Sequence, residues 1–353
     1  MHEQREPRCL IAAGGTAGHV LPSLAVAEAL SARGALVTFA GSPERVEARL
    51  VAEAGYAFDP FSVSGLPRRP GRRLVHALSV DARAPRACAR ILDARRPNVV
   101  LGGGGYVAGP MVYAAWRKKI PAALTEADAH LGLANRLAAP FARRVFLAYA
   151  IPGRDGSRYR VVGRPIPRSP QVTREDARRL FSLPADGPAL LVFGGSQGAE
   201  ALNEAALDAF GASGPTVLHL CGERYYEALR GRVTRDGYRL LPWTDDFAAA
   251  LAATDLVLAR AGGSVWEVAA AGKPAVLVPS PNVTADHQTK NARYFASGGG
   301  AVVVPEAELS RVPALVGSLL DDPGRLAEMG ASMLRASRPD AADRIAEELL
   351  ALA

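Results

Sequence analysis

The sequence predicts an α/β protein of two Rossmann-like domains, each with a doubly wound parallel sheet, that face one another across a cleft. Short apolar runs rich in β-branched residues alternate with longer Ala-, Leu- and Arg-rich helical patterns, an alternation typical of parallel sheets covered by helices. Twice, at residues 10–18 and 190–199, an apolar strand runs directly into a glycine-rich turn. The chain has 353 residues, more than one hydrophobic core usually supports, so we expect two domains.

The first domain is expected at residues 1–163. Its strands are predicted near residues 9–13, 36–40, 98–102, 121–124 and 144–148. Its helices are predicted near residues 20–33, 44–55, 74–95 and 106–117. Because the strand segments are almost continuously apolar, we expect a sheet that is buried on both faces.

The second domain is expected at residues 164–339 and repeats this scheme. Its strands are predicted near residues 189–193, 216–220, 255–259, 275–279 and 301–304. Residues 161–170 contain three prolines and no helical periodicity, so we interpret them as the hinge. After Pro323 we expect helix to the end of the chain, and the final helix, residues 340–353, could pack on either domain, including back on the first.

Composition favours a folded protein inside the cell. Apolar residues make up 49% of the chain and charged residues 22%, which argues against wholesale disorder. The three cysteines, Cys9, Cys88 and Cys221, are too few and too scattered for a disulfide framework, so we expect reduced core residues. The sequence shows neither an apolar signal region nor an uncharged apolar run of about 18 residues, so we expect no membrane span and no export.

The net charge of +7 points to anionic partners. A basic and apolar stretch follows residue 67, and we single out as membrane-docking candidates Arg72, Arg73, Leu74, Val75, Leu78 and the more distant Trp116. Arginines beside leucines suit an anionic lipid surface, but a solvated basic helix face has the same pattern. Nucleic-acid binding is disfavoured because no helix-turn-helix, zinc or aromatic RNA-reading signature accompanies the arginines.

The first glycine turn ends in a histidine. Gly14, Gly15 and Gly18 allow a ligand to approach the backbone at the start of a helix, although tight strand-to-helix packing also uses such turns. His19 could take a proton from an attacking hydroxyl near neutral pH. The alternative is that His19 only caps the helix.

The second turn combines compact backbone with donors for phosphate oxygens, Ser196 and Gln197. A further glycine turn, residues 260–267, follows the strand near 255–259, and open α/β sheets bind ligands between such turns. Glu267 could accept hydrogen bonds from two ribose hydroxyls, or it could simply complement the helix dipole. Polar residues gathered at 279–292 suit sugar hydroxyls.

Five segments together resemble the MurG family of UDP-N-acetylglucosamine transferases, which convert lipid I to lipid II in peptidoglycan synthesis: residues 14–19, 101–110, 194–199, 260–274 and 286–288. The resemblance runs from residue 10 to about residue 300 in the family's order and spacing. It implies a GT-B glycosyltransferase whose N-terminal domain receives the lipid-linked acceptor and whose C-terminal domain holds UDP-N-acetylglucosamine (UDP-GlcNAc).

The resemblance also implies residue roles. His19 is the general base candidate, Thr244 lies in the segment that meets the uracil, and Gln288 reads the sugar hydroxyls. The full set of implied substrate-binding residues is Thr16, Ala17, Gly18, Asp128, Arg164, Ser196, Gln197, Thr244, Gly263, Ser264, Val265, Glu267 and Gln288. The acceptor's C4 hydroxyl would attack C1 of the sugar from the face opposite UDP, with inversion. Backbone N–H groups would stabilise the leaving diphosphate, so we expect no tightly bound metal.

The chain departs from the family pattern at residues 125–128, where Thr-Glu-Ala-Asp replaces the common His-Glu-Gln-Asn. Asp128 in place of an asparagine cannot donate a hydrogen bond when ionised. The arginine expected after Pro165 falls on Pro167, with Arg164 nearby, and Trp266 stands where a small residue is common. These changes leave the nucleotide-sugar class intact and the acceptor open.

Two alternatives therefore remain: another GT-B enzyme, such as a glycolipid or secondary-metabolite glycosyltransferase or a UDP-sugar epimerase, and a non-catalytic nucleotide-sugar-binding protein. The partners that the family resemblance implies are UDP-GlcNAc, the undecaprenyl-pyrophosphoryl-MurNAc-pentapeptide acceptor, an anionic membrane surface and other cell-wall synthesis proteins. It places the protein peripherally on the cytoplasmic face of the bacterial membrane.

Overall fold

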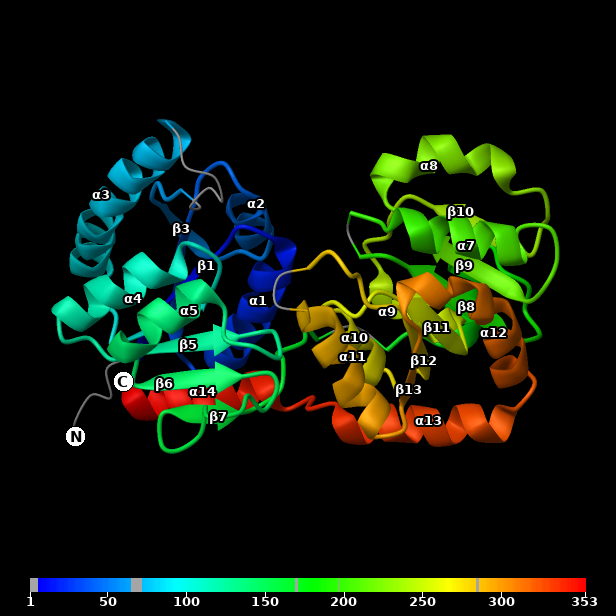
Figure 1. Ribbon diagram of the computed structural model, residues 1–353. Coiled ribbons are helices and arrows are strands. Elements are labelled where there is room, and N and C mark those ends of the chain that lie inside the picture. Colours follow the sequence, from blue (N-terminus) through cyan, green and yellow to red (C-terminus); the bar gives the residue numbers. More distant parts are fainter. Residues whose placement is uncertain (1–5, 65–71, 169–170, 196, 284–285) are drawn as a thin grey trace. The chain divides into compact units, whose positions relative to one another are not determined.

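The computed structural model describes residues 6–64, 72–168, 171–195, 197–283 and 286–353, with the backbone alone for residues 72–82. The chain divides into two compact units. The first comprises Met1–Arg168 and Pro339–Ala353, and the second Ser169–Arg338. Each unit has its own parallel sheet (Figure 1), so the predicted pair of doubly wound α/β domains is confirmed.

The first sheet has seven strands in the order β3-β2-β1-β4-β5-β6-β7. Their bounds are β1 Arg8–Ala13, β2 Leu36–Gly41, β3 Ala57–Pro60, β4 Val99–Gly104, β5 Ala122–Glu126, β6 Arg144–Leu147 and β7 Tyr159–Val161. Chain order runs outward in both directions from the neighbours β1 and β4. This pair is the topological switch point, where open α/β sheets bind ligands beyond the carboxyl ends of their strands.

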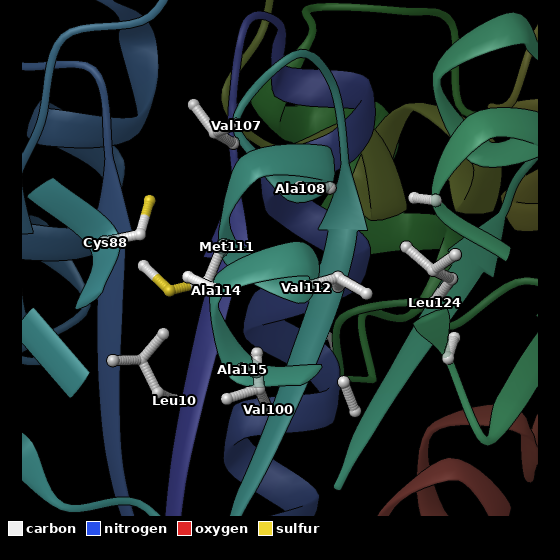
Figure 2. Close-up of a cluster of buried hydrophobic side chains, with 14 of the residues drawn as sticks. Leu10, Cys88, Val100, Val107, Ala108, Met111, Val112, Ala114, Ala115 and Leu124 are labelled. Carbon is white, nitrogen blue, oxygen red and sulfur yellow. The ribbon is translucent and has the colours of Figure 1, made fainter. Parts of the chain in front are cut away.

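Helices cover both faces of the first sheet. They are α1 Ala17–Ser31, α2 Val46–Glu53, α3 Arg72–Arg95, α4 Ala108–Arg117, α5 Leu133–Ala138 and α14 Ala341–Leu352. Successive strand residues point to opposite faces, so Leu10 of β1 packs with Cys88 of α3 and Met111 of α4 (Figure 2). Its neighbours Cys9 and Ile11 pack in a second cluster with α1, α2 and α14.

The last helix, α14, is fixed to α1 by burial and by ion pairs. Ile345 and Leu349 are fully buried, and burying a side chain of this size contributes about 1.5–3 kcal/mol. Arg33, two residues after the end of α1, also donates to Asp343 at 2.8 Å and to Glu347 at 3.0 Å. The end of the chain is therefore part of the core of the first unit.

The second sheet has six strands in the order β10-β9-β8-β11-β12-β13. Their bounds are β8 Ala189–Phe193, β9 Thr216–Leu220, β10 Tyr238–Leu241, β11 Leu256–Ala259, β12 Ala275–Leu277 and β13 Ala301–Val303. The helices of this unit are α6 Arg174–Leu180, α7 Glu200–Phe210, α8 Glu223–Leu229, α9 Phe247–Ala253, α10 Val265–Ala270, α11 His287–Ser297, α12 Val312–Leu320 and α13 Pro323–Ala336. The neighbours β8 and β11 form its switch point.

Three strands were not predicted from the sequence, and each lies at the edge of its sheet: β3, β7 and β10. Edge strands are short and partly exposed, so they lack the continuous apolar run that marks central strands. After Pro323 the chain forms two helices, α13 and the expected final helix α14, separated around Pro339, where proline cannot continue a helix. In the described part of the chain, no helix is both long and apolar enough to cross a bilayer.

Candidate functional site

The two glycine turns of the first switch point interlock. Gly14, after β1, donates its N–H to Gly104 O at 3.3 Å, and a Cβ on Gly105 would overlap the carbonyl of Gly14. Gly15, Gly104 and Gly105 have φ of +89°, +111° and +76°, a backbone region that residues other than glycine rarely adopt. The backbone of β1 and β4 is therefore held together where the two strands end.

His19 is the third residue of α1 and lies against this pair of turns. Its N–H donates to Thr16 O at 3.0 Å, and a Cβ on Gly104 would lie 2.5 Å from Nδ1 of the ring. Burial and the charge of Arg164 lower the pKa of His19 below its usual 6.5, while Asp128 opposes this shift. The imidazole is therefore neutral near pH 7, the form that can accept a proton.

Arg164, predicted to bind substrate, donates from Nη2 to Gly18 O at 2.6 Å. Gly18 O has no helical partner because Pro22, four residues on, has no N–H to donate. The guanidinium thus replaces the missing hydrogen bond at the start of α1. Thr16, Ala17 and Gly18 remain exposed or half-buried in the same turn.

The loop after β5 is organised by a buried carboxylate. Glu126 accepts hydrogen bonds from Gly132 N and Asn135 Nδ2, both at 2.9 Å, and from Asp128 N at 3.2 Å. Burial raises the pKa of Glu126, and these hydrogen bonds partly oppose the rise. Asp128 is half-buried and is one of the charges that act on His19.

Glu47 is a site residue that the sequence analysis missed. It is fully buried, and its carboxylate accepts from Gly15 N at 3.0 Å and from Ser42 N at 3.1 Å. One signal was available: Glu47 lies four residues before Val51 on the buried face of α2, where an acidic residue is rare unless it is paired.

At the second switch point, the turn after β8 is compact. Gly198 N donates to Gly195 O at 2.9 Å, and φ is +88° at Gly195 and +71° at Gly198. A Cβ on Gly198 would overlap the carbonyl of Cys221, whereas one on Gly195 would meet no atom of the described residues within 4 Å. Gln197 is exposed, and the predicted Ser196 lies outside the described residues.

The turn after β11 carries four predicted residues. Gly263, Ser264 and Glu267 are half-buried, and Glu267 lies in the first turn of α10. The Val265 side chain is fully buried, so this residue can reach a ligand only through its backbone. Trp266 is buried as well and packs on the rings of Tyr294 and Phe295, which accounts for a large residue at this position.

Two more predicted residues stand at the same edge of the second sheet. Thr244 follows β10, and its Oγ1 accepts from Asp246 N at 3.1 Å, just before α9. Gln288 lies in the first turn of α11, and its Oε1 accepts from Ser280 N at 2.8 Å. Arg260 supports this edge from beneath, since it donates to Val278 O at 3.1 Å and pairs with Glu306.

The membrane-docking candidates are only partly described. Five of them lie in α3, where the structure describes the backbone but not their side chains: Arg72, Arg73, Leu74, Val75 and Leu78. Trp116 of α4 is 49% exposed. Within the described residues, no group of three His, Cys, Asp or Glu side chains is placed to hold a metal ion.

Comparisons with known proteins match both units. Residues 9–147 match the glycosyltransferase family 28 N-terminal domain, and residues 189–345 match the family 28 C-terminal domain. Two relatives carry the name UDP-N-acetylglucosamine–N-acetylmuramyl-(pentapeptide) pyrophosphoryl-undecaprenol N-acetylglucosamine transferase. The relative from Salinibacter ruber is 40% identical over 99% of this chain and 98% of its own length, and the one from Halorhodospira halophila is 42% identical over 95% and 96%.

Among solved structures, MurG of Acinetobacter baumannii superimposes with a TM-score of 0.77 at 27% identity. The match covers 98% of this chain and 99% of the other. The similarity therefore extends across both units.

Proposed function

The chain belongs to glycosyltransferase family 28 and to the MurG family within it, and on this premise we propose that it transfers N-acetylglucosamine from UDP-GlcNAc to lipid I, forming lipid II in peptidoglycan synthesis. It is thus a GT-B hexosyltransferase. The observation in the structure that best supports this function is the β8/β11 switch point. Two glycine turns flank it, and Glu267 stands in the first turn of the following helix.

The donor half of the proposal rests on the second unit. Backbone N–H groups of the Gly194–Gly198 turn and of the Gly263–Val265 turn would bind the diphosphate and stabilise the charge that grows on it as the sugar leaves. Glu267 would accept hydrogen bonds from the ribose hydroxyls, and Gln288 would contact the sugar.

The acceptor half rests on His19. The C4 hydroxyl of the MurNAc residue would attack C1 of N-acetylglucosamine opposite the diphosphate, and neutral His19 would take the hydroxyl proton. The C1–O bond to UDP breaks as the new C1–O4 bond forms, so the α-linked donor gives a β-linked product. No step requires a metal ion.

We propose in addition that the first unit docks on the anionic membrane in which the acceptor is anchored. Besides Trp116, the adjacent α5 exposes Leu133 and Leu137, each 64% accessible. Exposed basic residues border these side chains: Arg117, Lys119, Arg136 and Arg143. Apolar side chains that enter the interface beside cations that attract lipid headgroups are the pattern of a peripheral membrane protein.

A coupled UDP-release assay tests the activity. We expect release from UDP-GlcNAc, and not from other UDP-sugars, only when a short-chain lipid I analogue is present. Absence of release with every combination would overturn the assignment, and interconversion of UDP-sugars without acceptor would identify an epimerase.

Sedimentation with anionic liposomes tests docking. The full chain should sediment at low salt, and the double variant Trp116→Ser, Leu137→Ser should sediment several-fold less. Matched substitutions at the exposed Leu180 and Trp243 of the second unit should leave sedimentation unchanged. Equal sedimentation of all three proteins would exclude the α4–α5 surface.

A further inference from the structure

Glu47 takes the place, at the first switch point, that an anionic ligand takes at many glycine-rich turns. Such turns bind anions because backbone N–H groups point at the ligand from the start of a helix. Here the N–H of Gly15 donates to Oε2 of Glu47 at 3.0 Å, and the N–H of Ser42 donates to Oε1 at 3.1 Å. The Glu47 side chain is fully buried, so the carboxylate is an internal group and not a surface charge.

Two glycines beside this carboxylate leave the space that the Glu47 side chain occupies. A Cβ on Gly14 would overlap the Glu47 carboxylate, and a Cβ on Gly41 would lie 2.9 Å from Cγ of Glu47. The residue that follows β1 and the last residue of β2 must thus both be small to admit the glutamate. The absence of side chains at these positions serves a protein group.

The held turn leads directly to His19. Glu47 packs against one side of Gly14 and Gly105 against the other. From Gly15 the chain continues into the first turn of α1. The ring of His19 lies against Gly104, on the strand that interlocks with Gly14. Displacement of the β1–α1 turn would therefore displace the imidazole.

We infer that Glu47 is a positioning residue: its carboxylate acts as a built-in anion that fixes the β1–α1 turn to orient His19, and it excludes the donor diphosphate from the Gly15 N–H. This inference rests on the proposed function for the identity of the donor and of the base. It distinguishes the two glycine turns, since in the first turn the Gly15 N–H already donates to a protein carboxylate.

Kinetics of Glu47→Gln test the positioning role. A glutamine carbonyl can accept one of the two N–H donors, but its NH₂ group faces the other, so the turn must shift. Because small misplacements of catalytic groups are costly, we expect kcat to fall about 10- to 100-fold, while the KM for UDP-GlcNAc stays within about twofold because its binding site is untouched. Glu53→Gln, on the exposed end of the same helix, is the control and should match the parent protein.

Chemical rescue separates positioning from general stability. In Glu47→Ala, added formate should restore part of the lost kcat by supplying a carboxylate, and it should restore none in His19→Ala. A kcat of Glu47→Gln within twofold of the parent, a matching rise in donor KM, or no rescue of Glu47→Ala would overturn the inference.

The unaltered full-length protein provides a test that does not depend on folding of a variant. On titration with UDP, followed by amide NMR, the resonances of Gly195, Gln197 and Gly198 should shift and that of Gly15 should not. A larger shift at Gly15 than at Gly195 would overturn the inference while leaving nucleotide binding intact. No shift at any of the four would contradict the donor site of the proposed function itself, and the inference with it.

Discussion

The carboxyl ends of β1 and β4 in the first sheet, here called the first edge, and those of β8 and β11 in the second sheet, the second edge, have the same topology. Both carry glycine-rich turns at equivalent places. At the first edge, a Cβ on Gly14, Gly104 or Gly105 would collide with Glu47, His19 or the Gly14 backbone. At the second, a Cβ on Gly195 or Gly262 would meet no atom of the described residues within 4 Å.

The difference teaches that a glycine-rich turn can serve either the protein or a ligand. In the first unit, glycines make room for a buried carboxylate and for the histidine ring. In the second, Gly194 and Gly198 also pack against protein backbone, whereas Gly195 and Gly262 have open space beside them among the described residues. Sequence motifs give both turns the same appearance, and only the neighbouring side chains separate the two uses.

The largest predicted effect is the loss of turnover when His19, at the first edge, is replaced. His19→Ala removes the proposed base, so kcat should fall by about a hundredfold or more, with the KM for UDP-GlcNAc nearly unchanged. The measurement is steady-state UDP release with the lipid I analogue. If the variant keeps kcat within about tenfold of the parent, a different group accepts the proton and the first edge has no catalytic role through His19.

A pair of glycine variants sharpens the comparison. Gly262→Ala adds a methyl group where no described atom lies within 4 Å, so it should leave the melting temperature unchanged and weaken UDP binding by about tenfold, or about 1.4 kcal/mol. Gly14→Ala overlaps Glu47, so it should destabilise the fold by about 1–3 kcal/mol and leave UDP affinity unchanged. Calorimetry of unfolding and of UDP binding gives both quantities, and the reverse pattern would refute the assignment of roles.

The sequence was sufficient for the central strands and for the position of the turns. Strands such as β1 and β4 are buried on both faces, so their residues form a continuous apolar run ending in glycine. The edge strands β3, β7 and β10 have no such signal, because pairing on one side only leaves them short and partly exposed. Parallel topology then brings the carboxyl ends of strands together, which made the gathering of the turns predictable.

The contacts within the candidate site could not be predicted. Arg164 and Gly18 are 146 positions apart, and the pattern shows only that Pro22 leaves a carbonyl without its helical donor. Glu47 reaches Gly15 across 32 positions, from a helix whose register is fixed by packing. Such pairs depend on how helices lie on the sheet, which local periodicity does not determine.

A smaller effect tests how the second turn is held. Beside Gly198, Cys221 O accepts from Asn203 Nδ2 at 2.9 Å, Asn203 Oδ1 lies 3.0 Å from His219 Nε2, and His219 Nδ1 lies 2.7 Å from Tyr238 Oη. Since Asn203 Oδ1 can only accept, His219 carries its proton on Nε2 and the hydroxyl of Tyr238 donates to Nδ1. The first turn is thus clamped by a carboxylate and the second by a neutral chain of hydrogen bonds.

Burial lowers the pKa of His219 from 6.5 to about 3. As the pH falls from 6.5, the unfolded chain takes up a proton that the folded chain refuses, so this residue should reduce the free energy of unfolding by ~1.4 kcal/mol per pH unit. His219→Gln keeps one donor and one acceptor without titrating. Urea unfolding between pH 7 and pH 4.5 should give a slope shallower by that amount, and an unchanged slope would show that His219 does not set the acid sensitivity.

The smallest predicted effect concerns the charge beside His19. Arg164 disfavours the protonated imidazole and lowers its pKa, so the active neutral form persists below the usual value of 6.5. Arg164→Gln retains an N–H donor for Gly18 O but removes the charge, so protonation of His19 should occur at higher pH. The acid limb of kcat/KM should then move to higher pH, whereas Arg164→Lys, which keeps the charge, should leave the limb in place. A limb that moves equally in both variants would show that loss of the positive charge is not what moves it, and would overturn the assignment of this effect to the charge of Arg164.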